Sequence, residues 1–539
     1  DWSPAPSGAF PVEWADPADA ELAWERDEMH HPFALPPLAM DFAVVTNGDG
    51  LNAGFEYFDA PIRTRTKPAN GFLYVAATYG VPDEEVPALL AGLRSRYRDF
   101  GSVTTAYWSV AVPELLAIYD QMRTLDVDGS PAEAVADGWR EAWRGLARAW
   151  GIHFVIIRGP YRISEDLADL YASIVPDAPK GTGYRLLQGG VDVLFEVDSG
   201  LERLATLAAG APEVAARLRS DPRPTLDELA ALAGGAPFVT ALRGFLEVHG
   251  HLGQSYSDFS EPSWAEDPGR LLSELANRLE HPPERADDRR RRLRAEAEEL
   301  IEDVRRRLAA RPAELADFER VLALAQEIGS LTETHNYWID RMSQARLRSL
   351  ADRVGRRLVR DGTLGAADDV LFLGRDEITD LLVAPRDMAA VIEARRAEFA
   401  RQRTVTPPRA IGRVDGDPGT AVGRPGEGAS QAPLDELRGT GASAGVVQGR
   451  ARVTLTPEDF NRIGRGDIIV CPATNPTWVP VFAIAAGLVT NTGGILAHAA
   501  VVAREFGLPA VVGVAGATLR IPDGRLIEID GTAGTVRLL

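Results

Sequence analysis

Hydrophobic and polar residues follow three different periodicities along this chain. Residues 1–80 mix aromatic-rich loops with short strand-like pieces, of which 70–77 is the clearest. From 83 to 403 apolar residues recur at helical spacing, and Pro82-Asp-Glu-Glu places acidic residues in the first turn of one helix. This spacing predicts strong helices near 111–126, 131–149, 236–250, 285–310, 312–328 and 331–360.

The periodicity is lost in residues 404–433, which are rich in Pro and Gly. A flexible linker of about 30 residues spans on the order of 30 Å, enough to let a following domain move between two sites. Strand-like and α/β patterns resume near Gly441. We therefore predict a multidomain protein: a mainly α-helical domain with a small β part at 1–403, a flexible linker at 404–433, and a three-layer α/β domain at 434–539.

Composition narrows the classes of function. The 539 residues carry a net charge of −20, whereas 434–539 balances nine Arg against nine acidic residues, so the excess lies in 1–433. An acidic body argues against binding to nucleic acid or to an anionic membrane. Cys471 is the only cysteine, and we expect it to be a core residue. We find no signal peptide and no apolar run of membrane length, and expect a cytoplasmic protein.

One histidine has a setting that suggests chemistry. His498 follows the glycine pair Gly493-Gly494 and opens a segment whose apolar residues Ala499, Val502, Ala503 and Phe506 recur at helical spacing. Gly507 is expected to end this helix, and a strand should follow Pro509. Free N–H groups and the positive end of the helix dipole make a helix start a phosphate site. A histidine there is suited to carry a phosphoryl group.

These residues resemble the phosphohistidine "swivelling" domain of phosphoenolpyruvate-utilising enzymes, which include phosphoenolpyruvate synthase, pyruvate phosphate dikinase, rifampicin phosphotransferase and phenylphosphate synthase. The resemblance covers 434–539 and also rests on 439–453, 472–480 and 485–490. It implies that His498 is phosphorylated, with support from Thr492, Gly493, Gly494 and Arg504. Relatives usually have Thr, Ser or Cys before the histidine, where this chain has Ala497. The alternative is a helix-capping histidine in an ordinary α/β domain.

The first domain resembles the acceptor-substrate domain of rifampicin phosphotransferase and of phenylphosphate-synthase-like proteins. The resemblance rests on 24–38, 249–253 with 262–264, 333–340 and 368–373. Relatives often have Arg where this chain has Leu252 and Ser263. The loss of two positive charges favours a neutral, apolar acceptor.

Several residues of this domain are candidates for the acceptor site. His251 is the first candidate for a general base, because a histidine with a pKa near about 6.5 can take the proton of a phenol. Glu333, His335, Tyr337 and Arg341 form a second group that could position the acceptor or receive the phosphoryl group. His31 beside His30, together with Phe72 and Tyr74, could line a pocket. The alternatives are a loop histidine, a structural ion-pair network and ordinary core aromatics.

The sequence contains no P-loop or kinase-type glycine-rich loop and no segment like an ATP-grasp region. We therefore expect the phosphoryl donor, ATP with Mg²⁺, to be bound by a separate ATP-grasp partner subunit, and we expect no metal site on this chain. The resemblance implies a two-component, dikinase-type phosphotransferase. Its acceptor would be a small phenol, such as phenol itself, 4-hydroxyacetophenone or a guaiacyl ketone from lignin breakdown. A component of an antibiotic (rifampicin-like) phosphotransferase and a non-enzymatic phosphocarrier or regulatory module remain alternatives.

Overall fold

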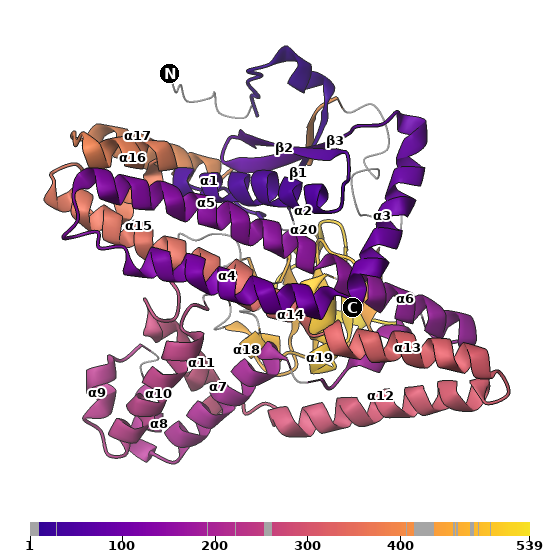
Figure 1. Ribbon diagram of the computed structural model, residues 1–539. Helices are drawn as coiled ribbons and strands as arrows, with labels where there is room; N and C mark the ends of the chain where they lie inside the picture. Colours follow the sequence, from indigo (N-terminus) through magenta and orange to yellow (C-terminus); the bar gives the residue numbers. More distant parts are fainter. Residues whose placement is uncertain are drawn as a thin grey trace.

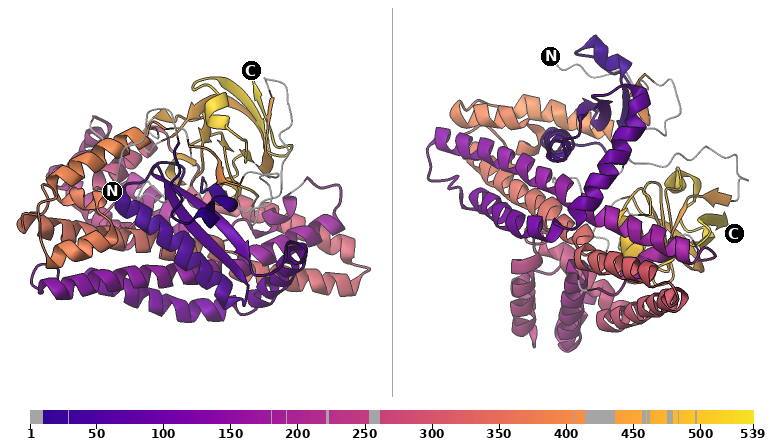
Figure 2. Two further views of the ribbon diagram at one scale, coloured as in Figure 1. Left: turned by 90° about the horizontal axis from the view of Figure 1, so that it is seen from above. Right: turned by 45° about the vertical axis from the view of Figure 1, so that its right-hand side comes forward.

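The computed structural model describes residues 10–539 except 29, 180, 191, 221–222, 253–260, 406, 414–435, 456–458, 460–461, 475–478, 483 and 496. A helical body forms most of the molecule, and the C-terminal domain, coloured orange to yellow, lies against it (Figures 1 and 2). The predicted multidomain class, mainly helical with a C-terminal β-sheet domain, is confirmed. Within the described residues, no helix combines the length and the apolar composition needed to cross a bilayer.

Helices account for most of 37–402. They are α1 (Pro37–Val45), α2 (Leu51–Tyr57), α3 (Val86–Gly101), α4 (Thr104–Thr124), α5 (Ala132–Ile156), α6 (Arg158–Ile174), α7 (Val193–Ala209), α8 (Pro212–Ser220), α9 (Leu226–Ala230), α10 (Gly235–His249), α11 (Pro268–Glu280), α12 (Ala286–Leu308), α13 (Pro312–Ile328), α14 (Leu331–His335), α15 (Met342–Arg360), α16 (Arg375–Val383) and α17 (Ala389–Gln402). Short 3₁₀ turns are η1 (Pro17–Glu21), η3 (Asp83–Glu85), η4 (Thr182–Leu187) and η6 (Ala367–Phe372), and two π-helical turns are η2 (Thr46–Gly50) and η5 (Asn336–Arg341).

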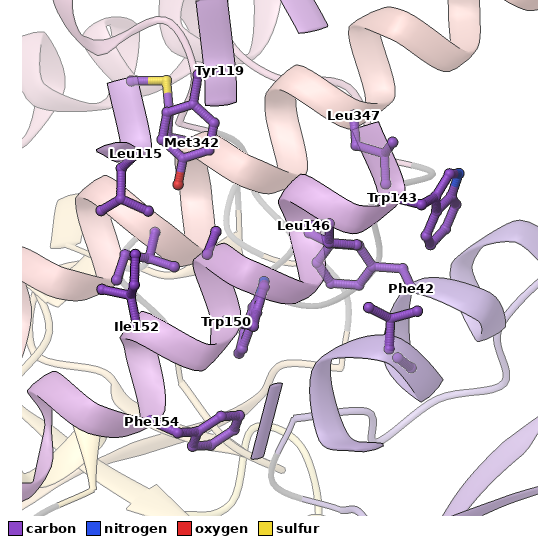
Figure 3. Close-up of a cluster of buried hydrophobic side chains, with 14 of the residues drawn as sticks. Phe42, Leu115, Tyr119, Trp143, Leu146, Trp150, Ile152, Phe154, Met342 and Leu347 are labelled. Carbon is purple, nitrogen blue, oxygen red and sulfur yellow. The ribbon is translucent and has the colours of Figure 1, made fainter. Parts of the chain in front are cut away.

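The core of the body is built around α5, which carries large apolar side chains at helical spacing. Trp139, Leu146 and Ile152 are buried, and the close-up shows Leu146 next to Phe42 of α1, with Met342 of α15 beside Tyr119 of α4 (Figure 3). Each of the six predicted helical segments is helical in the structure. The segment 331–360 differs in one respect, because η5 interrupts it between α14 and α15.

A four-stranded sheet covers one side of the body. Its strands, in spatial order β2-β3-β1-β4, are β1 (Ala23–Arg26), β2 (Ile62–Ala69), β3 (Phe72–Tyr79) and β4 (Ala410–Gly412). Strand β4 lies inside 404–433, the range predicted as linker. It pairs antiparallel with β1, and Ile411 packs with Trp24 in the core of the sheet. The predicted linker was therefore too long at its start, because a short apolar strand there completes a sheet begun at the other end of the chain.

The C-terminal domain is one mixed sheet with helices on its two faces. Its strands are β5 (Glu436–Arg438), β6 (Thr440–Ser443), β7 (Val446–Val453), β8 (Ile468–Cys471), β9 (Gly487–Thr490), β10 (Ala510–Val512), β11 (Leu526–Asp530) and β12 (Thr535–Leu538), in the order β5-β12-β11-β7-β8-β9-β10-β6. Side chains alternate between its faces. Ile469 and Cys471 pack on the side of α18 (Val479–Phe482) and α19 (His498–Phe506), whereas Ile468 and Val470 pack on the side of α20 (Ala517–Arg520). Cys471 is buried, as expected.

Candidate functional site

His498 is the first residue of α19, at the end of a glycine-containing turn. Gly493 has φ +114°, and a Cβ there would lie 3.1 Å from the Cβ of Ala497, so this turn needs glycine. Ala497 is extended and offers no side-chain cap, and Gly507 ends the helix in the left-handed conformation. The predicted glycine turn, helix start and C-cap are all present. The helix therefore presents its N-terminal end at the histidine.

The imidazole of His498 contacts the helical body through Glu333. His498 Nδ1 lies 2.9 Å from Glu333 Oε2, and the side chain of Glu333 is only 2% exposed. Because a carboxylate accepts, Nδ1 carries the proton, and Nε2 keeps its lone pair. In this docked arrangement Nε2 is covered and has no hydrogen-bond partner. The nitrogen free to form a bond to phosphorus is therefore shielded from solvent in this arrangement.

Other contacts hold α19 against the body. Gln188 donates to the backbone carbonyl of Arg504, and the guanidinium of Arg289 lies 4.3 Å from the ring centre of Phe506. Arg504 is buried and donates to the carbonyls of Ala442 and Ile495 at 3.0 and 2.9 Å. Burial lowers the pKa of Arg504 to about 10, so it stays charged at neutral pH. Arg504 thus holds the turn that precedes His498 through the carbonyl of Ile495.

Thr492 and Gly494, two predicted supporting residues of the turn, have different surroundings. Thr492 donates its hydroxyl to the carbonyl of Pro472 at 3.2 Å, which ties the turn to the end of β8. Gly494 is exposed, and a Cβ there would meet no atom within 4 Å. Residues 475–478, in a stretch that helped carry the family resemblance, lie outside the described part of the chain.

A cavity of about 350 Å³ lies beside this contact. The body supplies its walls from α6, η4, α12, α13 and α14, and α19 closes one side with Val501, Arg504 and Glu505. Residues 498, 501 and 505 share one face of a helix, so His498 belongs to the side that faces the body. Apolar and aromatic surface alternates with polar groups in the lining, which includes Tyr161, Tyr184, Leu186, Ile301, Thr332 and Glu333. Small-molecule sites commonly have this mixture.

Two further carboxyl groups face each other across the domain boundary at this cavity. Asp192 precedes α7 of the body, and Glu505 lies on α19. Burial raises the pKa of each carboxyl group, and the charge of Glu333 adds to both; the charge of Asp192 contributes further to the pKa of Glu505, which rises to about 8. Docking of α19 thus brings together acidic groups that separated domains would expose to water.

His335 and two partners form a buried group next to Glu333, which we call the histidine cluster: His153, His335 and Asp340. His153 Nδ1 lies 2.7 Å from Asp340 Oδ1, and the two imidazole centres are 4.8 Å apart. His335 donates Nδ1–H to the carbonyl of Leu331 at 2.6 Å. Burial lowers the pKa of His335 to about 4, so its ring is neutral at pH 7.

His251 lies in a different environment from the one its proposed role assumed. Its ring packs edge-on against Tyr337 at 4.4 Å, and Nε2 is buried without a hydrogen-bond partner. Burial, followed by the charges of Arg346, His249 and Arg341, lowers its pKa to about 3. The general-base hypothesis relied on a histidine pKa of about 6.5, and the pKa of this buried ring lies well below it. Residues 253–260, including Gly253, lie outside the described residues.

Tyr337 and Arg341 are both buried on η5. The Tyr337 hydroxyl donates to the carbonyl of Val248, and His249 Nδ1 lies 3.0 Å from the same hydroxyl. Leu252, whose replacement of an arginine suggested a neutral acceptor, is buried in the core with Trp264. Tyr337 thus fastens the end of α10 to η5, and none of these residues lines the cavity described above.

The remaining predicted pocket residues lie around the N-terminal sheet. Phe72 and Tyr74 pack with Trp24 in its core, which corrects the hypothesis that they form a pocket wall. Their alternation on a half-buried strand explains this placement. His31 is buried near Asp27 and Asn47, and burial lowers its pKa to about 4. Among the described contacts, those of His31 do not reach the His498–Glu333 pair.

The sequence reading assigned no role to His153, Asp340, Asp192 or Glu505. One signal was available for His153, because it lies in the otherwise apolar segment Ile152-His-Phe-Val-Ile156, where a titratable side chain needs a partner. Asp340 is five residues after His335, a spacing that does not align two residues on an α-helix. The proximity of Asp340 to His335 depends on the π-helical turn η5, which the sequence pattern does not predict.

Comparisons with known proteins agree with the two parts of this site. Residues 463–534 match the "PEP-utilising enzyme, mobile domain" family, and 167–333 match the "Rifampicin phosphotransferase fourth domain" family. The second range ends at Glu333 and includes most of the cavity wall.

Three relatives illustrate how the matches are distributed. Chondramide synthase cmdD of Chondromyces crocatus is 30% identical over 98% of this chain but only 14% of its own length. The uncharacterized phosphotransferase YvkC of Bacillus subtilis is 27% identical over 77% of this chain and 51% of its own length. A rifampicin phosphotransferase of Bacillus cereus is 29% identical over 65% of this chain and 40% of its own length. The chain thus spans about half or less of the length of these relatives.

Proposed function

This chain belongs to the PEP-utilising enzyme family and has domains like the C-terminal ones of rifampicin phosphotransferase, and from this premise we propose that it transfers a phosphoryl group through His498. His498 receives the group from a donor and passes it to the hydroxyl of an acceptor bound in the helical body. The observation that carries the proposal is the contact of His498 with Glu333, which holds the imidazole against the body beside a ligand-sized cavity whose lining includes Glu333.

Glu333 suits the second half of this reaction. When phosphohistidine gives up its phosphoryl group, the bond from Nε2 to phosphorus breaks and its electron pair returns to the ring. A carboxylate at Nδ1 holds the proton on that nitrogen, so the leaving group is neutral imidazole rather than an anion. The acceptor oxygen forms the new bond to phosphorus and loses its proton to a base. Positioning and charge stabilisation dominate such transfers.

We propose a small phenol as the acceptor. A volume of about 350 Å³ lies at the lower end of the roughly 300–1,000 Å³ usual for ligand pockets, which favours a single ring over a large antibiotic. Tyr161, Tyr184 and Ile301 offer aromatic and apolar surface for the ring. The carboxyl groups in the same lining, Glu333 among them, are the candidates to take the phenolic proton. This proposal moves the acceptor from the surroundings of His251 to those of Glu333.

A rifampicin-like acceptor is the second candidate. It is favoured by the matches to several proteins named rifampicin phosphotransferase, among them one from Bacillus cereus and one from a Streptomyces species. The two candidates differ in the size of the acceptor, so a panel that contains both kinds of compound separates them.

We further propose that the donor is ATP with Mg²⁺, bound by a separate ATP-grasp subunit that would release AMP and phosphate by analogy with the family. The test combines the purified chain, that partner, labelled ATP, a panel of phenols and rifampicin. The expected result is label first on the protein and then on a phenol. Label on rifampicin alone would select the second candidate. Labelling of the protein without transfer to any hydroxyl compound would favour a phosphocarrier instead.

A further inference from the structure

We propose that the histidine cluster, His153, His335 and Asp340, binds a divalent transition-metal cation of the zinc, cobalt or manganese class. The three side chains come from α5, α14 and η5 and are all buried. One possible ligand atom from each lies within 4.8 Å of the others. This site differs from the His498–Glu333 contact, and nothing in the proposed phosphoryl transfer requires it.

The separations fit a cation between the three groups. Ligand atoms about 2.0–2.2 Å from a tetrahedral zinc ion are about 3.3–3.6 Å apart. The observed separations bracket this range, with 2.7 Å between His153 Nδ1 and Asp340 Oδ1 and at most 4.8 Å between any two of the three groups. Small rotations of buried side chains would therefore complete the site.

The orientation of His335 also fits a ligand. Its Nδ1–H donates to the carbonyl of Leu331 at 2.6 Å, which leaves the lone pair on Nε2. Metal-binding histidines nearly always make such a bond with the nitrogen that does not face the metal, because it fixes the tautomer and the ring. His153 is held in turn by Trp150, whose ring centre lies 4.7 Å away. The surroundings are thus ordered and largely apolar.

The π-helical turn explains how two of the ligands come together. Residues five apart on an α-helix are about 140° apart around its axis and face different directions. A π-helix has more residues per turn, and its i→i+5 hydrogen bond brings such residues closer to one face. Residues 336–341 form this turn, which brings Asp340 to the face of His335. π-turns inside α-helices occur frequently at functional sites.

The ligand types indicate the class of cation. Two imidazole nitrogens and one carboxylate oxygen suit zinc, cobalt, manganese or iron(II), whereas magnesium and calcium prefer oxygen ligands alone. Since Glu333 precedes His335 by two residues and contacts His498, a bound cation would add positive charge near the carboxylate on which the phosphohistidine docks.

The test uses the full chain, free of affinity tags, stripped with a chelator and titrated with zinc, cobalt(II), manganese(II) or magnesium chloride without ATP or acceptor. We expect about one equivalent of zinc or cobalt by calorimetry and elemental analysis, visible absorption from bound cobalt(II), and no saturable binding of magnesium. X-ray absorption of the zinc complex should show two imidazole ligands. His335→Ala, His153→Ala and the gentler Asp340→Asn should each weaken binding by about tenfold or more.

Two histidines act as controls. His281→Ala, after α11, and His498→Ala should bind zinc like the wild type. The proposal is overturned if the stripped wild-type chain binds no cation. It is also overturned if folded Asp340→Asn binds zinc as tightly as the wild type and X-ray absorption shows ligands other than two imidazoles. In that case the 2.7 Å contact is an ion pair only. Because no phosphoryl transfer is measured, this result is independent of the proposed function.

Discussion

His498 Nδ1 and Glu333 Oε2 lie 2.9 Å apart across the boundary between two parts of the chain separated by 165 positions. The pair defines a docked state in which one ring nitrogen is held by the body and the other is shielded from solvent. A carrier histidine and an acceptor domain need such a state only while the phosphoryl group is delivered. Under the proposed mechanism, this contact makes the two half-reactions separable by mutation.

Replacement of His498 by Ala should abolish labelling of the protein. With the ATP-binding partner and ATP labelled in its β- and γ-phosphates, the wild type should form an acid-labile adduct, and His498→Ala should form neither adduct nor product. His281→Ala serves as the control, because it removes a histidine away from α19. Undiminished turnover by His498→Ala would refute the mechanism.

Glu333→Gln should slow transfer of the phosphoryl group from His498 to the acceptor and leave phosphorylation of His498 nearly unchanged. A hydrogen bond to a charged group contributes about 1.5–3 kcal/mol, which corresponds to roughly 10–150-fold in rate. Single-turnover transfer from prelabelled protein to the acceptor should fall within that range. The glutamine keeps the shape of the side chain, so the melting temperature should change little. An equal loss in protein labelling would instead place Glu333 on the donor side.

A large side chain at Ser330 should block the cavity. Ser330 lines it between α13 and α14, and Ser330→Phe is expected to raise KM for the acceptor or prevent its binding, with labelling of His498 intact. The matched control is Ala323→Phe, an exposed position of α13 that does not line the cavity. If both variants transfer to the acceptor normally, the acceptor binds elsewhere.

Docking should weaken as pH rises. In the docked state burial raises the pKa of Glu505 to about 8, whereas an exposed Glu titrates near about 4.3. Between these values docking takes up a proton, so the docked state is most favourable at low pH and loses stability up to about pH 8. Small-angle scattering at pH 6 and pH 9 should show a more extended particle at the higher pH.

The charge-neutral variant Glu505→Gln should reduce this pH dependence. Asp192 titrates in the same direction and would leave a weaker residual effect. Glu528→Gln on β11 removes a carboxyl group away from the cavity and should behave like the wild type. Scattering that is identical at both pH values in wild type and variant would show that the carboxyl pair does not control docking.

His251→Ala should affect transfer less than loss of a general base would. A positioned base typically contributes about 10²–10⁴-fold, but a histidine whose pKa is about 3 is a poor proton acceptor. We expect a loss below that range, with His498 labelling unchanged. A loss of about 100-fold or more in a folded variant would restore His251 as the base and imply that the bound phosphoryl group raises its pKa.

The sequence predicted those features that depend on local pattern. Helical spacing from Ala499 to Phe506, the glycine turn and the C-cap at Gly507 are properties of a few neighbouring residues, and the structure contains all three. The same is true of the long helices of the body. The sequence did not predict that Phe72 and Tyr74 lie in a core, because an aromatic residue on a strand has the same pattern in a core as in a pocket wall.

The remaining features depend on contacts between distant segments. Strand β4 is three residues long and forms only because β1 offers it an edge, so the Pro- and Gly-rich composition around it predicted linker. The pKa of His251 is set by burial and by arginines about 90 positions away. The pairing of His153 with Asp340 needs both a π-turn and a helix nearly 190 positions earlier. Periodicity in a single sequence contains none of this information.

The covering of His498 Nε2 in the docked state has a consequence for the speed of the whole cycle. A nitrogen that is shielded from solvent while His498 contacts the body cannot meet a phosphoryl donor at the same time, so the body acts as a tethered competitor of the donor for the same ring. Tight docking would protect phosphohistidine from hydrolysis yet delay the next charging step, and loose docking would do the reverse. Turnover should thus be greatest at an intermediate docking strength, and variants that tighten the interface should lower kcat.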